Sequence, residues 1–220
     1  GVFQKPWLHV AGQEIGMPGT PFLLIDYQIW PDNLPMTAGN IAAVIDLKLL
    51  ERRQFTECPP VTIDASKQYV ATLKTEKGDI RIALFADKAP ITVNSFVFLA
   101  RSGWFDNTTF HRVLPGQVAQ TGDPSGTGFG GPGYAFINEN AGMKFDRQGL
   151  VAMANSGPDT NGSQFFFTLG AAPQWDGGYT IFGEVISGME IIQGLSPRDP
   201  SRGLDLPPGD KVLSVAIEER

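Results

Sequence analysis

Between residues 110 and 183 the chain consists of short apolar runs, each ended by a loop rich in glycine, proline or asparagine. This pattern constrains the fold more than any other feature, because short strands separated by turn residues are typical of β-sandwiches and β-barrels. The runs that we expect to form strands are His111–Leu114, Gly149–Ala154, Gln164–Leu169 and Tyr179–Phe182. Pairing over such long sequence separations predicts a barrel.

The segments on either side of this region complete the expected barrel. Lys88–Ser102 predicts an amphipathic helix, because Pro90 suits a first helical turn and Gly103 suits a C-terminal cap. The other expected elements are a β-hairpin, a brief helix and a final strand: Tyr69–Leu73 with Ile80–Phe85, Met189–Leu195 and Lys211–Ile217. The predicted fold is mainly β, a closed antiparallel β-barrel capped by two α-helices, with a small α/β N-terminal extension.

The chain is expected to divide near two adjacent prolines, Pro59 and Pro60. A residue before proline is pushed toward extended conformations, and no apolar periodicity continues through this stretch. We therefore expect an extension over residues 1–57, a linker over 58–67 and the barrel over 68–220. Within the extension the sequence predicts a strand at Pro21–Ile29 and a helix from about Ala38 to Phe55, too little for an independent core.

Composition excludes several functional classes. Acidic residues outnumber basic ones by 23 to 17, for a net charge of −6, and no long basic block is present, so no nucleic-acid partner is expected. No apolar run approaches the roughly 20 residues of a spanning helix, so no membrane partner is expected. One cysteine, Cys58, and two histidines exclude an internal disulfide and a thiolate-rich zinc site. We expect no metal and no cofactor.

Two long motifs carry the chemistry. The first reads Phe-His-Arg-Val-Leu-Pro-Gly over residues 110–116 and continues to Gln-Thr-Gly-Asp at 120–123. The second reads Met-Ala-Asn-Ser-Gly over 153–157 and continues to Thr-Asn-Gly-Ser-Gln-Phe-Phe at 160–166. Together they resemble the two signature regions of the cyclophilin family of peptidyl-prolyl cis/trans isomerases (rotamases). The resemblance extends from about Tyr69 to Glu218 and implies an enzyme or chaperone of protein folding.

The first motif contains a residue type suited to this reaction. Rotation about an X-Pro bond faces a barrier of roughly 18–20 kcal/mol set by amide resonance, and no bond is made or broken. A catalyst therefore needs only to bind the twisted amide better than the planar one. In the twisted state the prolyl nitrogen regains a lone pair, to which a guanidinium can donate a hydrogen bond. Arg112 is the candidate.

The resemblance implies a role for each matching residue. The catalytic residues would be Arg112, Gln120 and Asn155: Gln120 would hold the guanidinium and a substrate carbonyl, and the backbone of Asn155 would hydrogen-bond the residue before proline. Phe166 would form the apolar wall for the proline ring. Further substrate-binding positions would be Val118, Ala154, Gln164, Gln117, Gly126, Trp175 and Tyr179. The expected partners are proline-containing peptides and unfolded proteins.

Several positions depart from the family pattern. Gln117 replaces a usual aromatic residue, Val118 stands at a methionine-type position, and Tyr179 stands where a histidine is common. Trp175 falls where the proline pocket usually has an aliphatic residue, and Gln174 falls where a tryptophan often binds cyclosporin, although a one-residue slip in that loop would make Trp175 that tryptophan. These changes leave the Arg-Gln-Phe core intact but predict weak cyclosporin binding.

Other patterns favour structural roles. Residues 126–131 satisfy the dinucleotide pattern GxGxxG, but Pro132 and Gly133 follow where a phosphate-binding helix would begin, so we expect a flexible loop beside the groove. His111 has no nearby nucleophile or second histidine and is assigned to structure. Phe165, Phe166 and Phe167 alternate along a strand, so at least one of them faces the core.

The extension carries a weaker resemblance. Gly-Thr-Pro at residues 19–21, followed by Phe-Leu-Leu-Ile-Asp, is similar to the cis-proline turn and strand of thioredoxin-fold thiol oxidoreductases. An ordinary X-Pro turn before a strand explains the segment nearly as well. The CxxC pair is absent, so we expect no redox activity. Such a fusion would favour an exported bacterial protein; the sequence starts with glycine, carries no export signal and otherwise leaves the compartment unknown.

Two other functions remain open at this point. A cyclophilin-like module could bind proline peptides as a scaffold with little turnover, an alternative favoured by the changed positions Gln117, Val118 and Tyr179. The second alternative is a composite folding factor, in which the extension recruits client proteins. Retention of Arg112, Gln120 and Phe166 favours the enzyme.

Overall fold

The computed structural model describes residues 3–4, 9–10, 13–14, 54–55, 57–202 and 206–220. Its main feature is a nine-stranded antiparallel sheet in the order β6-β13-β4-β5-β12-β10-β11-β8-β7. The strands are β4 (Tyr69–Thr75), β5 (Gly78–Leu84), β6 (Thr108–Thr109), β7 (Arg112–Leu114), β8 (Val118–Thr121), β10 (Leu150–Met153), β11 (Phe165–Thr168), β12 (Ile181–Ser187) and β13 (Lys211–Glu219). The predicted mainly β fold is confirmed, with each expected strand of the barrel present.

Smaller elements surround this sheet. The helices are α3 (Pro90–Arg101) and α4 (Met189–Gln193), with 3₁₀ turns at Pro173–Trp175 and Pro200–Arg202. Two short strand pairs lie outside the main sheet: β1 (Phe3–Gln4) with β9 (Ala135–Phe136), and β2 (His9–Val10) with β3 (Gln13–Glu14). Among the described residues, no helix is long and apolar enough to cross a membrane.

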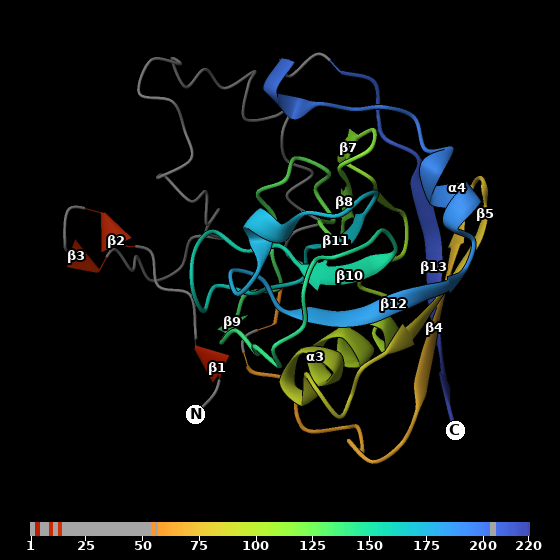
Figure 1. Cartoon of the computed structure of the whole chain (residues 1–220). Helices are drawn as coiled ribbons and strands as arrows, with labels where there is room; N and C mark the ends of the chain where they lie inside the picture. The colour runs from red at the N-terminus through yellow and green to blue at the C-terminus, as the bar shows by residue number, and fades with distance from the viewer. Residues whose placement is uncertain (1–2, 5–8, 11–12, 15–53, 56, 203–205) are drawn as a thin grey trace.

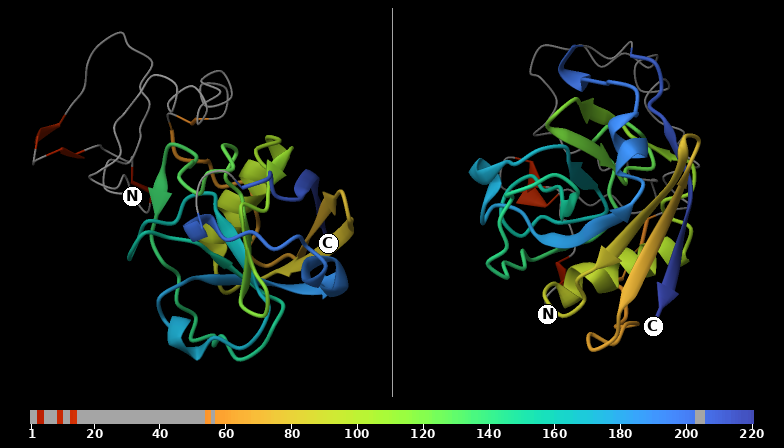
Figure 2. Two further views of the ribbon diagram at one scale, coloured as in Figure 1. Left: turned by 90° about the horizontal axis from the view of Figure 1, so that it is seen from above. Right: turned by 45° about the vertical axis from the view of Figure 1, so that its right-hand side comes forward.

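The sheet curls strongly into a half-barrel. In Figure 1, β12, β10, β11, β8 and β7 follow one another above α3, while β5, β4 and β13 stand to one side. Figure 2 shows β4, β5 and β13 side by side as one wall. The edge strands β6 and β7 do not pair with each other, so the expectation of a closed barrel was overstated. β6 pairs with β13 and β7 pairs with β8, and an isolated bridge joins Val113 of β7 to Arg198.

Helix α3 begins and ends as its sequence predicts. Pro90 occupies the first turn, and Gly103 just beyond the helix adopts φ +70°, a left-handed conformation that glycine tolerates best. Ala89, at the N-cap position just before the helix, makes no side-chain hydrogen bond to it. Instead the carboxylate of Glu139 accepts hydrogen bonds from the backbone N–H groups of Ile91 and Thr92, at 3.0 and 2.7 Å. A distant loop thus completes the helix.

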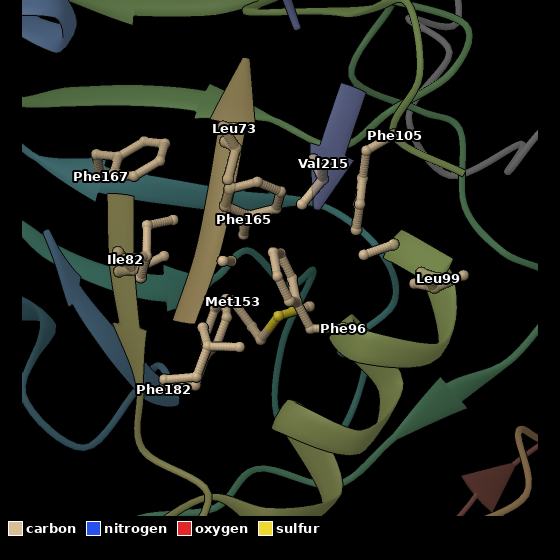
Figure 3. Packing of buried hydrophobic residues seen from close by; sticks show 14 of the residues in the cluster. Leu73, Ile82, Phe96, Leu99, Phe105, Met153, Phe165, Phe167, Phe182 and Val215 are labelled. Carbon is tan, nitrogen blue, oxygen red and sulfur yellow. The ribbon is translucent and has the colours of Figure 1, made fainter. Parts of the chain in front are cut away.

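The main core lies between α3 and the inner face of the curled sheet. In Figure 3, Phe96 of α3 points toward Phe165 of β11 and Phe182 of β12. The Phe96 ring lies 5.3 Å from each of those two rings. Phe165 and Phe167 are 1% and 0% exposed and both belong to this core. The prediction that at least one phenylalanine of this run faces the core is therefore confirmed.

A second apolar cluster lies on the other face of the sheet. Phe166 belongs to it, because successive side chains of a strand point to opposite faces. Its other buried members are Val118, Phe145, Leu150, Ala152, Ala172 and Ile181, and Trp175 and Tyr179 are half-buried against them. This second cluster supplies the apolar part of the candidate site.

The segment before β4 has no helix or strand over residues 57–68. It is held to α3, since the backbone N–H of Thr62 donates to Asn94 at 2.7 Å and Asn94 donates to the carbonyl of Pro60 at 2.9 Å. Phe55 packs against Phe98, with ring centroids 4.9 Å apart. The predicted strand at residues 21–29 and nearly all of the helix predicted from residue 38 lie outside the described residues.

Candidate functional site

Three residues of the candidate site form one row across the sheet. Arg112 of β7 pairs with Gln120 of β8, Gln120 pairs with Phe166 of β11, and Phe166 pairs with Ala152 of β10. Directly opposed residues in antiparallel strands project from the same face. The guanidinium, the amide and the phenyl ring therefore share the outer face, although 54 residues separate Arg112 from Phe166 in the sequence.

Hydrogen bonds join the polar members of this row. Arg112 Nη1 donates to Gln120 Oε1 at 3.4 Å, and Gln120 Nε2 donates to Gln164 Oε1 at 3.0 Å. Gln164 Nε2 then donates to the carbonyl oxygens of Gly128 and Gly130 at 2.8 and 3.0 Å. Arg112, Gln120 and Gln164 are all half-buried. The guanidinium is thus held on one side and keeps further donors for another partner.

Four aromatic rings form the apolar side of the site. The ring of Trp175 lies edge-on to Phe166 at 5.3 Å, and that of Tyr179 lies edge-on at 5.5 Å. Phe145 stacks on Phe166 at 6.1 Å. Phe166 itself is only 4% exposed. The apolar surface open to a ligand is therefore shared by the half-buried Trp175 and Tyr179 with the edge of Phe166.

Asn155 lies two residues beyond the end of β10. Its neighbour Ala154 is tied to β11, because the Ala154 N–H donates to the Gln164 carbonyl at 2.9 Å. The Asn155 side chain donates to the carbonyl of Gly178 at 3.1 Å and accepts from the N–H of Gly157 at 3.2 Å. Among the described residues, the backbone N–H and C=O of Asn155 have no hydrogen-bond partner. Both groups are left for a ligand.

The remaining predicted positions differ in accessibility. Val118 is 1% exposed within the second cluster, whereas Gln117 is exposed in the turn between β7 and β8. Gly126 lies in the loop after β8 with φ +67°, and a side chain there would press on Thr109. No helix follows residues 126–131, where a dinucleotide-binding turn would require one.

His111 lies behind this loop, buried to 2% exposure. Burial lowers the pKa of its imidazole, the Asp123 carboxylate raises it in part, and the Arg198 guanidinium lowers it further. A buried imidazole that resists protonation fits the structural role expected of it. Among the described residues, no group of three or more potential metal ligands comes together.

The sequence interpretation missed Phe145. It lies in an irregular segment between glycines and charged residues, where no periodicity marks a core position. Its backbone N–H donates to Asp176 at 2.8 Å, and its own carbonyl accepts from Ala172 at 2.7 Å, which holds the ring over Phe166.

Residues 70–215 match the family model described as cyclophilin type peptidyl-prolyl cis-trans isomerase/CLD. The chain belongs to this family. A cyclophilin relative, the peptidyl-prolyl cis-trans isomerase A of Mycobacterium tuberculosis, is 43% identical over 180 residues, which cover 73% of this chain and 98% of that protein. The peptidyl-prolyl cis-trans isomerase-like 2 of Cryptococcus neoformans is 41% identical over 172 residues, covering 74% of this chain and 30% of that protein.

Solved cyclophilin structures share the fold. The crystal structure of a Cryptosporidium parvum cyclophilin type isomerase matches with a TM-score of 0.62 at 36% identity, covering 69% of this chain and 98% of that one. A second structure of that protein, in the presence of the dipeptide Ala-Pro, matches with a TM-score of 0.61 at 36% identity and covers 68% of this chain and 98% of that one.

Proposed function

We propose that this cyclophilin is a peptidyl-prolyl cis/trans isomerase that accelerates rotation about X-Pro bonds in peptides and unfolded proteins. The observation that carries the proposal is the cross-strand row of Arg112, Gln120 and Phe166, which joins a held guanidinium to an apolar wall. Relatives at 43% identity bear the name of this activity, and the Cryptosporidium parvum neighbour has been crystallised with Ala-Pro.

The mechanism follows from what each group is able to bind. The proline ring packs against the edge of Phe166 with Trp175 and Tyr179, and the free backbone groups of Asn155 hydrogen-bond the residue before proline. Rotation removes the amide resonance, and the prolyl nitrogen then accepts a hydrogen bond from Arg112 that the planar amide cannot accept. Each 1.36 kcal/mol of such preference raises the rate about tenfold.

A rate measurement on matched arginine variants tests this assignment. Proline-limited refolding or a chymotrypsin-coupled peptide assay would compare the wild type with Arg112→Ala. The exposed Arg101, which pairs with Glu219 at 3.3 Å far from the row, provides Arg101→Ala as the control. We expect a loss of at least about tenfold for Arg112→Ala and none for the control. Equal isomerisation rates for wild type and Arg112→Ala would contradict the catalytic role of Arg112.

The same experiment separates the enzyme from the scaffold alternative. A scaffold would bind an Ala-Pro peptide through the aromatic cluster without accelerating its isomerisation. An enzyme requires the guanidinium to stay fixed, and the hydrogen bond to Gln120 favours that. Binding of the peptide with no acceleration by the wild type would establish the scaffold in place of the enzyme.

Weak cyclosporin binding belongs to the same proposal. Its grounds are the changed positions Gln117, Val118 and Tyr179, together with Trp175, whose ring lies 5.3 Å from that of Phe166 where the family usually has an aliphatic residue. Sub-micromolar inhibition in a competition assay would contradict this.

For the rest of the chain we propose the division into residues 1–57, 58–67 and 68–220, with the first part related to the C-terminal part of a thioredoxin fold. A truncation that begins at residue 54 keeps Phe55 on Phe98 and tests whether the barrel is an independent unit. It should unfold cooperatively and retain the wild-type isomerisation rate if the extension serves only to recruit clients. A loss of that rate would assign the extension to the site itself.

A further inference from the structure

A loop organised by internal hydrogen bonds borders the site. The loop comprises residues 123–130, Asp-Pro-Ser-Gly-Thr-Gly-Phe-Gly, and follows β8 directly after the Gln120 strand. Its two carbonyl oxygens at Gly128 and Gly130 both accept from the side chain of Gln164. The loop is therefore the last link of the hydrogen-bond chain that starts at Arg112.

The donor and the acceptor of each hydrogen bond in this series are fixed from both ends. Backbone carbonyls only accept hydrogen bonds, so the Nε2 group of Gln164 must face the loop and its Oε1 must face Gln120. Gln120 must then present Nε2 to Gln164 and Oε1 to Arg112, and a guanidinium only donates. Two amides that are free to rotate by 180° elsewhere have one satisfied orientation here.

The loop itself is organised by one buried carboxylate. Asp123 is 0% exposed and accepts from the backbone N–H and hydroxyl of Ser125, at 2.8 and 2.7 Å, and from the backbone N–H of Gly128 at 2.6 Å. A side-chain carbon at Gly130 would collide with Asp123 Oδ1, so the chain passes directly over the carboxylate. Asp123 thereby sets where the carbonyls on either side of residue 129 point.

From these contacts we propose that Asp123 is a positioning residue for the isomerase reaction, acting on Arg112 through the loop carbonyls, Gln164 and Gln120. The proposal rests on the proposed function of the site. With the loop in place, the acceptor atom of Gln120 always faces Arg112 and keeps the guanidinium oriented for the twisted amide. Without it, Gln164 loses the two acceptors that fix its orientation, and both glutamines sample inverted amides that present N–H groups toward Arg112.

The chain offers a matched control for Asp123. Asp64 accepts from the backbone N–H and hydroxyl of Ser66, at 2.9 and 2.7 Å, with the same spacing as Asp123 and Ser125. That turn lies before β4, outside the hydrogen-bond chain of the site. The pairs Asp123→Asn with Asp64→Asn, and Ser125→Ala with Ser66→Ala, thus make the same change in two places: the first replaces one carboxylate oxygen by an NH₂ donor, and the second removes the serine hydroxyl.

The experiment measures kcat and KM for a proline peptide, together with the side-chain NH₂ resonances of Gln120 and Gln164 by NMR. We expect kcat to fall about tenfold in Asp123→Asn and severalfold in Ser125→Ala, with KM changed less than twofold, because the aromatic cluster and Asn155 are untouched. The glutamine resonances should shift and lose their protection from solvent exchange in the same two variants. Both Asp64 and Ser66 variants should match the wild type in each readout.

The outcomes separate this proposal from that of the function. Unchanged glutamine resonances in Asp123→Asn, or an equal fall of kcat in the Asp64 control, would overturn the positioning role. If Asp123→Asn does not fold, Ser125→Ala decides by the same two criteria. A wild type without isomerase activity would contradict only the proposed function. The NMR resonances of Gln120 and Gln164 would still test whether Asp123 orients the two glutamines.

Discussion

Strand β11 carries three successive phenylalanines that serve two different regions of the molecule. Phe165 and Phe167 point into the main core between the sheet and α3, where they are 1% and 0% exposed. Phe166 points to the outer face, in a small cluster bordered by the half-buried Trp175 and Tyr179. The inner region is buried between the sheet and α3, whereas the outer one adjoins the hydrogen-bonded row of Arg112. One strand thus separates residues that hold the fold from residues of the proposed substrate site.

This difference predicts that the two faces respond to the same substitution in opposite ways. The largest effect on stability is expected for Phe165→Ala, because its ring contacts Phe96 at 5.3 Å and Phe105 at 5.5 Å deep in the core. Removing a buried phenylalanine costs about 3–5 kcal/mol of unfolding free energy, including the cavity that it leaves. Urea denaturation measures this. Activity per folded molecule should stay near wild type, and a selective loss of activity would break the comparison.

Phe166→Ala is expected to show the converse. Its unfolding free energy should fall by less than that of Phe165→Ala, since Trp175 and Tyr179 border the cluster and are able to relax into the vacated space. Isomerisation should fall at least about tenfold, because the proline ring loses its wall. Phe166→Leu, which keeps an apolar side chain, is the control and should retain part of the rate. Equal activity in both variants would move the proline pocket elsewhere.

The sequence predicted the inner region well and the outer one in part. Alternation along β11 and the capping residues of α3 are local signals, so the strands, the helix and a core position for at least one of the three phenylalanines followed from them. The resemblance to the family motifs predicted that Arg112, Gln120 and Gln164 belong to one site, and in the structure hydrogen bonds join their side chains. Phe145 and the loop carbonyls were missed, because a main-chain acceptor has no sequence signature and an isolated aromatic in a loop has no periodicity.

The open edge of the sheet was missed for a related reason. A pattern of short strands predicts pairing but not whether the first and last strands meet. Here β6 pairs with β13 and β7 with β8, and among the described residues no ladder joins β6 to β7.

Helix α3 covers only the inner region, so a change at its N-terminus should affect stability alone. Glu139 accepts from the N–H groups of Ile91 and Thr92 and from the Thr92 hydroxyl at 2.6 Å. Glu139→Ala leaves these donors without that acceptor and should lower the unfolding free energy by about 1–2 kcal/mol. Glu139→Gln, which retains one acceptor oxygen, should lose less. A change in isomerisation rate without loss of stability would show that α3 also influences the outer face.

The smallest expected effect concerns His111, which lies between the two regions: its chain neighbour is Arg112, and a side chain at Gly128 would touch its ring. Burial lowers the pKa of His111, with Asp123 opposing and the guanidinium groups of Arg198 and Arg112 reinforcing the shift. In the unfolded chain a histidine titrates near pH 6.5. As the pH falls through about 6.5 the unfolded chain therefore takes up a proton that the folded chain does not, and stability decreases, whereas above about pH 7.5 the group contributes no pH dependence.

Urea denaturation between pH 8 and 5.5 isolates this contribution. The exposed carboxylates whose pKa values are lowered, those of Asp64, Asp199 and Glu219 by their hydrogen bonds, lose their effect only at pH values near 4 and below. The wild type should lose stability across the window, and His111→Gln, which has no imidazole to protonate, should show a flatter dependence. His9 is present in both proteins, so the difference belongs to His111. If the unfolding free energies of wild type and His111→Gln changed with pH in parallel, the folded protein would accommodate a protonated His111 behind the loop that holds Gln164. That loop would then be more mobile than the hydrogen bonds of the buried Asp123 carboxylate indicate.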